Sequence, residues 1–260
     1  MLSSATKPPV RSEVRFGVLV VIIDREEAGN SISLATASAM HEALRLAAER
    51  QDLRGVVVTG AGDRFFCSGG DLKAYSTIAT RDELASTFGT VRDLLIKIES
   101  YRLPVIAAIN GYALGGGAEL ALGCDLRFAD ARAKIGFPQS RLGLIPGWNG
   151  TERLVRTIGR SQAMRLLLTA ERLTAAEAVS IGLIDEVSDG DVVNHAVSFL
   201  AGLPAAPLAL AAVKRAVHAS GSPGAGAITA EIFEDLWFTQ DHREAEKAFA
   251  EKRDPVFRGR

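Results

Sequence analysis

The stretch Ile109–Asp125, INGYALGGGAELALGCD, places three consecutive glycines immediately before a run with helical spacing. The first N–H groups of a helix have no partner within the helix and carry a partial positive charge. Glycines let another molecule approach this backbone, because they have no Cβ. Glu119 follows in the first helical turn. The stretch predicts a site that holds a developing negative charge beside a carboxylate; the alternative is that the glycines only permit tight helix–sheet packing.

A second loop of small residues lies upstream at Phe65–Lys73, FFCSGGDLK. Its backbone N–H groups are expected to point at the same atom as those of the glycine run. Ser68 also raises the alternative of a nucleophilic serine, but no G-x-S-x-G sequence surrounds it. No Walker loop and no strand–GxGxxG–helix unit occurs either, since Gly115–Gly117 lacks the required spacing.

Around these loops, short apolar runs alternate with longer amphipathic ones, which predicts a parallel sheet with helices packed on it. Gly17 marks a turn between two short strands within 14–23. After about Thr151 helices dominate, apart from a short strand at 183–187. The expected strands are 55–60 and 104–109, and the expected helices are 31–50 and 81–99.

Composition excludes several classes of protein. The formal net charge is −1 with no long basic run, which argues against a dedicated nucleic-acid or membrane-surface binder. No segment has the roughly 18 apolar residues of a bilayer span. The two cysteines, Cys67 and Cys124, form neither a disulfide framework nor paired zinc-ligand spacing. We therefore expect a cytoplasmic protein, with an unrecognised transit peptide in the Ser-rich first ten residues as the alternative.

Together the motifs resemble the crotonase superfamily, the enoyl-CoA hydratase and isomerase family. The resemblance runs from about Glu13 to the C-terminus. It implies a ClpP/crotonase-like α/β spiral of strand–strand–helix units over residues 13–200, after a flexible tail at 1–12. A helical region at 201–260 is implied to serve trimerisation, giving a homotrimer or a dimer of trimers. The motifs that carry the resemblance are Gly69–Asp71, Asn110–Ala113, Leu142–Gly147 and Glu251–Arg253.

The resemblance implies chemistry on an acyl-CoA thioester, with coenzyme A in the substrate and no other cofactor. Its enolate-like intermediate carries negative charge on the carbonyl oxygen, and one fixed N–H donor is typically worth about 10²–10³ in rate. By position in the two motifs, we predict the backbone amides of Ser68 and Gly116 as the oxyanion hole. Glu119 is the predicted acid/base, which contributes roughly 10²–10⁴; the alternative is a carboxylate that only caps the helix.

Gln139 departs from the family, since typical hydratases carry a second glutamate after this proline. A glutamine orients water but cannot exchange a proton near neutral pH. Hydration or isomerisation remains the first hypothesis. Decarboxylation of a methylmalonyl- or ethylmalonyl-type CoA ester is the second, because Gln139 does not repel a substrate carboxylate, and the segment 144–150 is similar to that of the ethylmalonyl-CoA decarboxylase branch. A third hypothesis is a non-catalytic relative that binds acyl-CoA.

Further residues match the family's substrate-contacting stretches. Trp148 is expected to form a wall of the acyl pocket, with plain core packing as the alternative. Lys73 is expected near a phosphate, or else is an ordinary solvated lysine. The family's usual Asn-Arg-Pro is replaced by 24–26, Asp-Arg-Glu, so phosphate contacts there are not predicted. The expected CoA- and substrate-binding residues are Ala28, Gly69, Gly70, Asp71, Leu72, Lys73 and Trp148.

Overall fold

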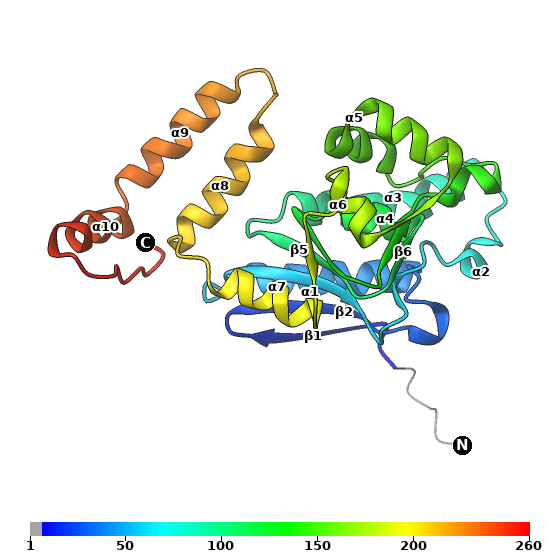
Figure 1. Cartoon of the computed structure of the whole chain (residues 1–260), viewed down its shortest axis with the longest axis horizontal. Coiled ribbons are helices and arrows are strands. Elements are labelled where there is room, and N and C mark those ends of the chain that lie inside the picture. Colours follow the sequence, from blue (N-terminus) through cyan, green and yellow to red (C-terminus); the bar gives the residue numbers. More distant parts are fainter. Residues whose placement is uncertain (1–6) are drawn as a thin grey trace.

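The computed structural model describes residues 7–260 and contains two β-sheets with helices packed around them (Figure 1). The larger sheet has six strands in the order β1-β2-β3-β5-β7-β10. Only β1 runs antiparallel to its neighbour, and the other pairs are parallel. Its strands are β1 (Val10–Arg15), β2 (Val18–Ile23), β3 (Gly55–Gly60), β5 (Val105–Ile109), β7 (Leu126–Asp130) and β10 (Glu186–Ser188).

The smaller sheet has four short strands in the order β4-β6-β8-β9, with β9 antiparallel and the others parallel. Each of the first three follows a strand of the larger sheet after a short turn, so the chain winds as strand–strand–helix units. These strands are β4 (Phe65–Cys67), β6 (Tyr112–Leu114), β8 (Lys134–Gly136) and β9 (Arg172–Thr174).

Helices cover both faces of the larger sheet, and α8 to α10 project to one side of it (Figure 1). Two 3₁₀ turns, η1 (Glu26–Ala28) and η2 (Pro138–Leu142), lie in the loops near the site. The helices are α1 (Leu34–Ala48), α2 (Leu72–Tyr75), α3 (Arg81–Glu99), α4 (Gly116–Leu122), α5 (Gly150–Thr169), α6 (Ala175–Ser180), α7 (Val192–Ala201), α8 (Pro207–Ala219), α9 (Ala225–Trp237) and α10 (Gln240–Glu251).

The core lies on both faces of the larger sheet. Every residue of β2, β3 and β5 is buried, as expected of parallel strands covered on two sides. On one face, alternate residues of these strands pack against α7. On the other face they pack against α1, α3, α4 and the smaller sheet in one continuous apolar cluster. The site described below lies within this second layer, where the two sheets and α4 meet.

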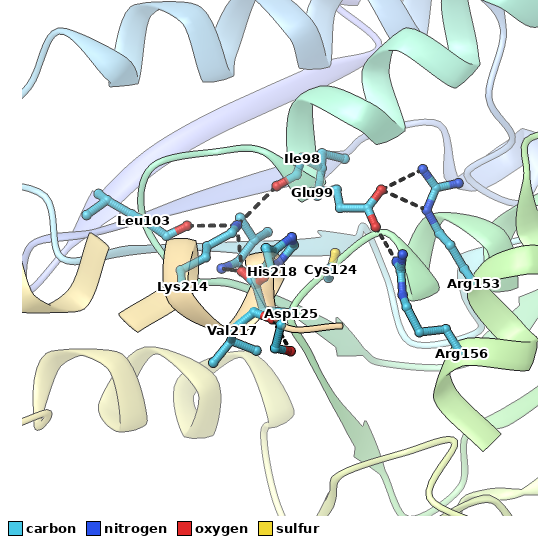
Figure 2. Close-up of polar contacts among 12 residues, drawn as sticks. Ile98, Glu99, Leu103, Cys124, Asp125, Arg153, Arg156, Lys214, Val217 and His218 are labelled. Atoms are coloured by element: carbon cyan, nitrogen blue, oxygen red, sulfur yellow. Dashed lines mark hydrogen bonds and ion pairs between the residues drawn. The ribbon is translucent and has the colours of Figure 1, made fainter. Parts of the chain in front are cut away.

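A buried ion pair attaches α8 to the core (Figure 2). The ammonium of Lys214 lies 2.7 Å from the carboxylate of Asp125 and donates to the carbonyls of Ile98 and Leu103, each at 3.2 Å. His218, one turn further along α8, contacts the other oxygen of Asp125 at 3.0 Å. This cluster satisfies the buried charge of Lys214, which is only 7% exposed.

Most elements lie where the sequence predicts them. The helix 81–99 and the strand 55–60 match α3 and β3 residue for residue. The predicted tail at 1–12 is wrong at its inner end, because β1 begins at Val10 and pairs with β2; residues 1–6 lie outside the described part of the chain. The expected strand at 183–187 forms later, at β10, and the three-residue strands β4 and β6 carry too few residues for a detectable alternation.

Candidate active site

The side chain of Glu119 is the buried anion at the centre of the site, with only 2% of the residue exposed. Its Oε2 accepts from the backbone N–H groups of Trp148 at 2.7 Å and Gly150 at 2.9 Å. Its Oε1 accepts from the backbone N–H of Gly147 at 3.2 Å and from Nε2 of Gln139 at 3.1 Å. A carboxylate has about four acceptor positions, so all of them are in use.

Burial and hydrogen bonding act on Glu119 in opposite directions. Burial is the larger effect and raises the pKa of this carboxyl above its ordinary value, because a low-dielectric surrounding disfavours the charge. The four N–H donors stabilise the ionised form and limit that rise. Close packing fixes the geometry, since a Cβ on Gly150 would lie 2.4 Å from Glu119 Cγ. The Glu119 side chain is therefore held in a fixed position, and its pKa is raised above that of an exposed glutamate.

Gln139 is brought next to Glu119 by η2, twenty residues further along the chain. Its Nε2 donates to the carboxylate, and this donor is the only one of the four on a side chain. Its Oε1 is buried and has no hydrogen-bond partner among residues 7–260. A buried acceptor without a partner is costly, which indicates that a substrate group or water donates to it.

The structure contradicts Ser68 as an oxyanion-hole donor, because its backbone N–H already donates to the carbonyl of Gly29 at 2.9 Å. The adjacent residues are held by Ile32, which donates to the Gly69 carbonyl at 2.8 Å and accepts from Asp71 N–H at 3.0 Å. In a trans peptide the N–H points away from the C=O. The N–H of Gly70 therefore points away from Ile32, and it has no acceptor among the described residues.

Gly116 is the first residue of α4, so its N–H has no partner within the helix. A Cβ built on Gly69 would lie 3.2 Å from this nitrogen, so the two loops predicted from the sequence lie side by side. Gly117 makes this approach possible, since a Cβ there would lie 2.0 Å from the carbonyl oxygen of Cys67. The geometry therefore favours the amides of Gly70 and Gly116 as the paired donors.

Trp148 connects the two donors to Glu119. The residue is 2% exposed, and its six-membered ring lies against Gly116 and Gly70, where added Cβ atoms would approach ring carbons to 2.2 Å and 3.4 Å. Its backbone N–H binds Glu119 at the same time. Trp148 is thus packed into the site rather than into a remote part of the core, although its contact with an acyl group remains a prediction.

The other predicted binding residues lie along the approach to these amides. Asp71 is occupied structurally: it caps α2 and forms an ion pair with Arg25 at 2.8 Å. Leu72 is 67% exposed, and Lys73 is exposed and has no acidic partner within residues 7–260. Ala28 ends η1, next to the Gly29 carbonyl that binds Ser68. Their contacts with coenzyme A remain predictions.

The residues that hold the loop 147–150 against Glu119 were not predicted from the sequence. Arg153 on α5 donates to the carbonyl of Trp148 at 2.7 Å. Arg153 is also paired with Glu99, which binds Arg156 as well (Figure 2). Arg92 on α3 donates from Nε to the carbonyl of Gly147 at 3.0 Å. Only the glycines of the run 147–150, GWNG, signalled a special backbone there, and no local pattern pointed to either arginine.

Comparison with known proteins finds relatives over nearly the whole chain. The family model described as enoyl-CoA hydratase/isomerase matches residues 13–260. The chain is 37% identical to the 2,3-dehydroadipyl-CoA hydratase of Escherichia coli K12, over 94% of this chain and 96% of that protein. It is 38% identical to the enoyl-CoA isomerase/hydratase fer4 of Mycosarcoma maydis, over 97% and 96% of the two chains. A crystal structure of enoyl-CoA hydratase from Bacillus anthracis superposes with a TM-score of 0.93 and 32% identity, covering 97% of this chain and 100% of that one.

The fold and the comparisons define an acyl-CoA-processing enzyme, and its candidate site combines two backbone amides with one buried carboxylate. The chain belongs to the enoyl-CoA hydratase/isomerase family, as the family model and relatives at 35–38% identity over most of its length show. The fold is that of the crotonase superfamily, as the resemblance implies.

Proposed function

We propose that this enzyme adds water reversibly to a 2-enoyl-CoA thioester, with Glu119 as its single proton-transferring group. The observation that carries the proposal is the pairing of Glu119 with Gln139, whose buried Oε1 is left without a partner. A water molecule that donates to this oxygen lies beside the carboxylate. In this arrangement Gln139 orients the water, and Glu119 exchanges the proton.

One carboxylate is sufficient for the proton transfers of this hydration. The water oxygen bonds to the β-carbon, the double bond shifts its electrons to the α-carbon and carbonyl oxygen, and Glu119 takes one water proton. Glu119 then returns that proton to the α-carbon. The N–H groups of Gly70 and Gly116 stabilise the negative charge on the carbonyl oxygen, each worth about 2.7–4 kcal/mol in such sites. To accept a proton, the carboxylate must release one donor, and Gln139 is the donor with a rotatable side chain.

Two other reactions use the same groups. Isomerisation needs one carboxylate to move a proton between two carbons of a 3-enoyl-CoA. Decarboxylation of a methylmalonyl- or ethylmalonyl-CoA needs the two amides and one proton donor, and a neutral Gln139 does not repel the substrate carboxylate. We rank decarboxylation lower, because the relatives with similar sequences are named hydratases and isomerases.

Mass spectrometry of the products formed in D₂O tests the proposal. Crotonyl-CoA, a 3-enoyl-CoA, methylmalonyl-CoA and ethylmalonyl-CoA are incubated separately with the wild type and with Glu119→Gln. We expect crotonyl-CoA to gain one D₂O in the wild type only. A shifted double bond in the 3-enoyl ester alone assigns the isomerase reaction, and loss of carbon dioxide with α-deuteration assigns the decarboxylase. Tight binding without turnover of any ester contradicts catalysis.

We further propose that the enzyme is a homotrimer or a dimer of trimers formed through α8–α10. Large apolar side chains on and after these helices are exposed, including Phe233 at 61%, Phe238 at 78% and Phe249 at 88%. Exposed apolar area of this kind is typical of an interface. Sedimentation that shows a stable monomer would refute this assembly.

We also propose a cytoplasmic location. Cys67 and Cys124 are buried free thiols, a state that a reducing compartment preserves. Over residues 7–260, no helix is long and apolar enough to cross a membrane. Fractionation that recovers the protein in an organelle would contradict the location.

A further inference from the structure

One peptide unit joins α3 to the carboxylate of the site. The peptide between Gly147 and Trp148 donates its N–H to Glu119 Oε2 at 2.7 Å, the shortest of the four bonds to this carboxylate. The carbonyl of the same peptide accepts from Arg92 Nε at 3.0 Å. The guanidinium, the peptide and the carboxylate therefore form one hydrogen-bonded chain. Such a chain polarises each member in the direction that stabilises negative charge on the carboxylate.

Within residues 7–260, the bond to the Gly147 carbonyl is the one hydrogen bond that the Arg92 side chain forms. Arg92 is half-buried, and it forms no ion pair with any acidic side chain of residues 7–260. Helix α3 also contacts the loop 147–150 one turn before Arg92, at Phe88. A Cβ on Gly147 would lie 2.8 Å from the Phe88 ring. The loop is thus pressed against α3 at Phe88 and hydrogen-bonded to it at Arg92, with the positive charge aimed at the peptide.

We propose that Arg92 is a positioning residue for the proposed reaction: through the 147–148 peptide it orients and polarises the N–H that holds Glu119. The inference rests on the function of Glu119 proposed above. The unpaired charge favours the ionised carboxylate, because opposite charge near a carboxyl lowers its pKa. The bond from Arg92 also keeps the Trp148 N–H aligned with Glu119 when Gln139 turns toward water.

The other charged groups around Glu119 do not replace Arg92. Arg153 on α5 also binds the loop, but at the Trp148 carbonyl, and its charge is compensated by Glu99 at 2.9 Å. The thiol of Cys67 on β4 is neutral, since burial raises its pKa to about 12. The remaining charged side chains on η2 and the first turn of α5 are exposed; they are Arg141 and Glu152.

The test compares Arg92→Met with a matched control, Arg156→Met. Arg156 lies on α5 and pairs with Glu99, and within residues 7–260 it forms no hydrogen bond to residues 147–150. Its loss therefore removes an arginine near the same cluster without removing a bond to the 147–148 peptide. The Glu119 carboxyl is titrated by ¹³C NMR of glutamate-labelled protein, and its resonance is identified by its absence from Glu119→Gln. The pH profile of kcat/KM is measured on the same variants.

We expect Arg92→Met to raise the pKa of Glu119 by about 0.5–1 unit, moving the acidic limb of the profile to higher pH by the same amount. Arg92→Lys, which retains the charge, should restore at least half of the shift, and Arg156→Met should leave both readouts unchanged. If Arg92→Met fails to fold, Arg92→Gln takes its place, because it removes the charge and retains a donor.

The two readouts separate this inference from the proposed function. An unchanged Glu119 titration in folded Arg92→Met, or an equal shift in Arg156→Met, overturns the role of Arg92. A shifted Glu119 titration in Arg92→Met supports the role of Arg92. If the pH profile of kcat/KM does not shift with it, or if the enzyme turns over no substrate, the assignment of Glu119 as the proton-transferring group is overturned instead.

Discussion

Replacing Glu119 with Gln tests the centre of the site with the smallest change in volume. The amide has one oxygen in place of two, whereas four N–H donors point at this side chain. The oxygen should take the Oε2 position, where the two shorter bonds of 2.7 and 2.9 Å lie. The new NH₂ then faces the N–H of Gly147 and the side chain of Gln139. Gln139 can turn its Oε1 toward the NH₂, so Gly147 alone loses its acceptor.

The stability cost follows from that single loss. A buried N–H without an acceptor costs about 1–3 kcal/mol, and removal of a buried charge offsets part of it. We therefore expect the free energy of unfolding to fall by about 2 kcal/mol or less, so the variant still folds. Turnover should fall much further, by about 10²–10⁴, since a positioned proton transfer is lost. At about 1.36 kcal/mol per tenfold, this is roughly 2.7–5.4 kcal/mol of transition-state stabilisation.

The assay measures product formation from crotonyl-CoA by mass spectrometry, together with urea unfolding of the same preparation. Glu152→Gln is the matched control, because Glu152 lies on the first turn of α5 close to Gly150 but is exposed. It should alter neither measurement. A folded Glu119→Gln enzyme with more than a tenth of wild-type kcat would contradict the assignment of Glu119, because the carboxylate would then not exchange the proton.

Three further changes give separate outcomes. Gln139→Glu places a second carboxyl about 3 Å from Glu119 Oε1. The two carboxyls should share a proton, so that the pKa of one of them is strongly raised. Crotonyl-CoA hydration should then rise about tenfold or more, with a bell-shaped pH profile. A profile unchanged from wild type would contradict this coupling. Ser68→Ala should leave kcat/KM within about twofold, because it removes only a hydroxyl whose one bond is to the Ala28 carbonyl at 3.5 Å within residues 7–260. A hundredfold loss would support the alternative of a nucleophilic serine. Lys214→Met should lower the free energy of unfolding by about 3 kcal/mol, since it leaves a partly buried carboxylate without its cation; a chemical denaturation midpoint equal to that of the wild type would show that the ion pair contributes nothing.

The sequence alone determined the class of fold and the region of the site. Helical spacing over 81–99 and the apolar run 55–60 predicted α3 and β3, because periodicity reports which faces of an element are buried. The glycines before Glu119 predicted a helix start beside a carboxylate, and α4 begins at Gly116. The order of motifs also identified the family. These features are local, so the chain encodes them within a few residues.

The tertiary structure decided which polar groups are free and which are already paired. The loop 67–71 contains several amides, and its sequence does not say which one lacks a partner. The pairing of Ile32 across Gly70 and the bond from Ser68 to Gly29 leave the Gly70 amide free, contrary to the sequence-based assignment. Likewise, Glu119 is held by residues 139 and 147–150, and that loop by Arg92. A hydrogen-bond partner depends on the register and packing of segments far apart in the chain, and no local pattern records them.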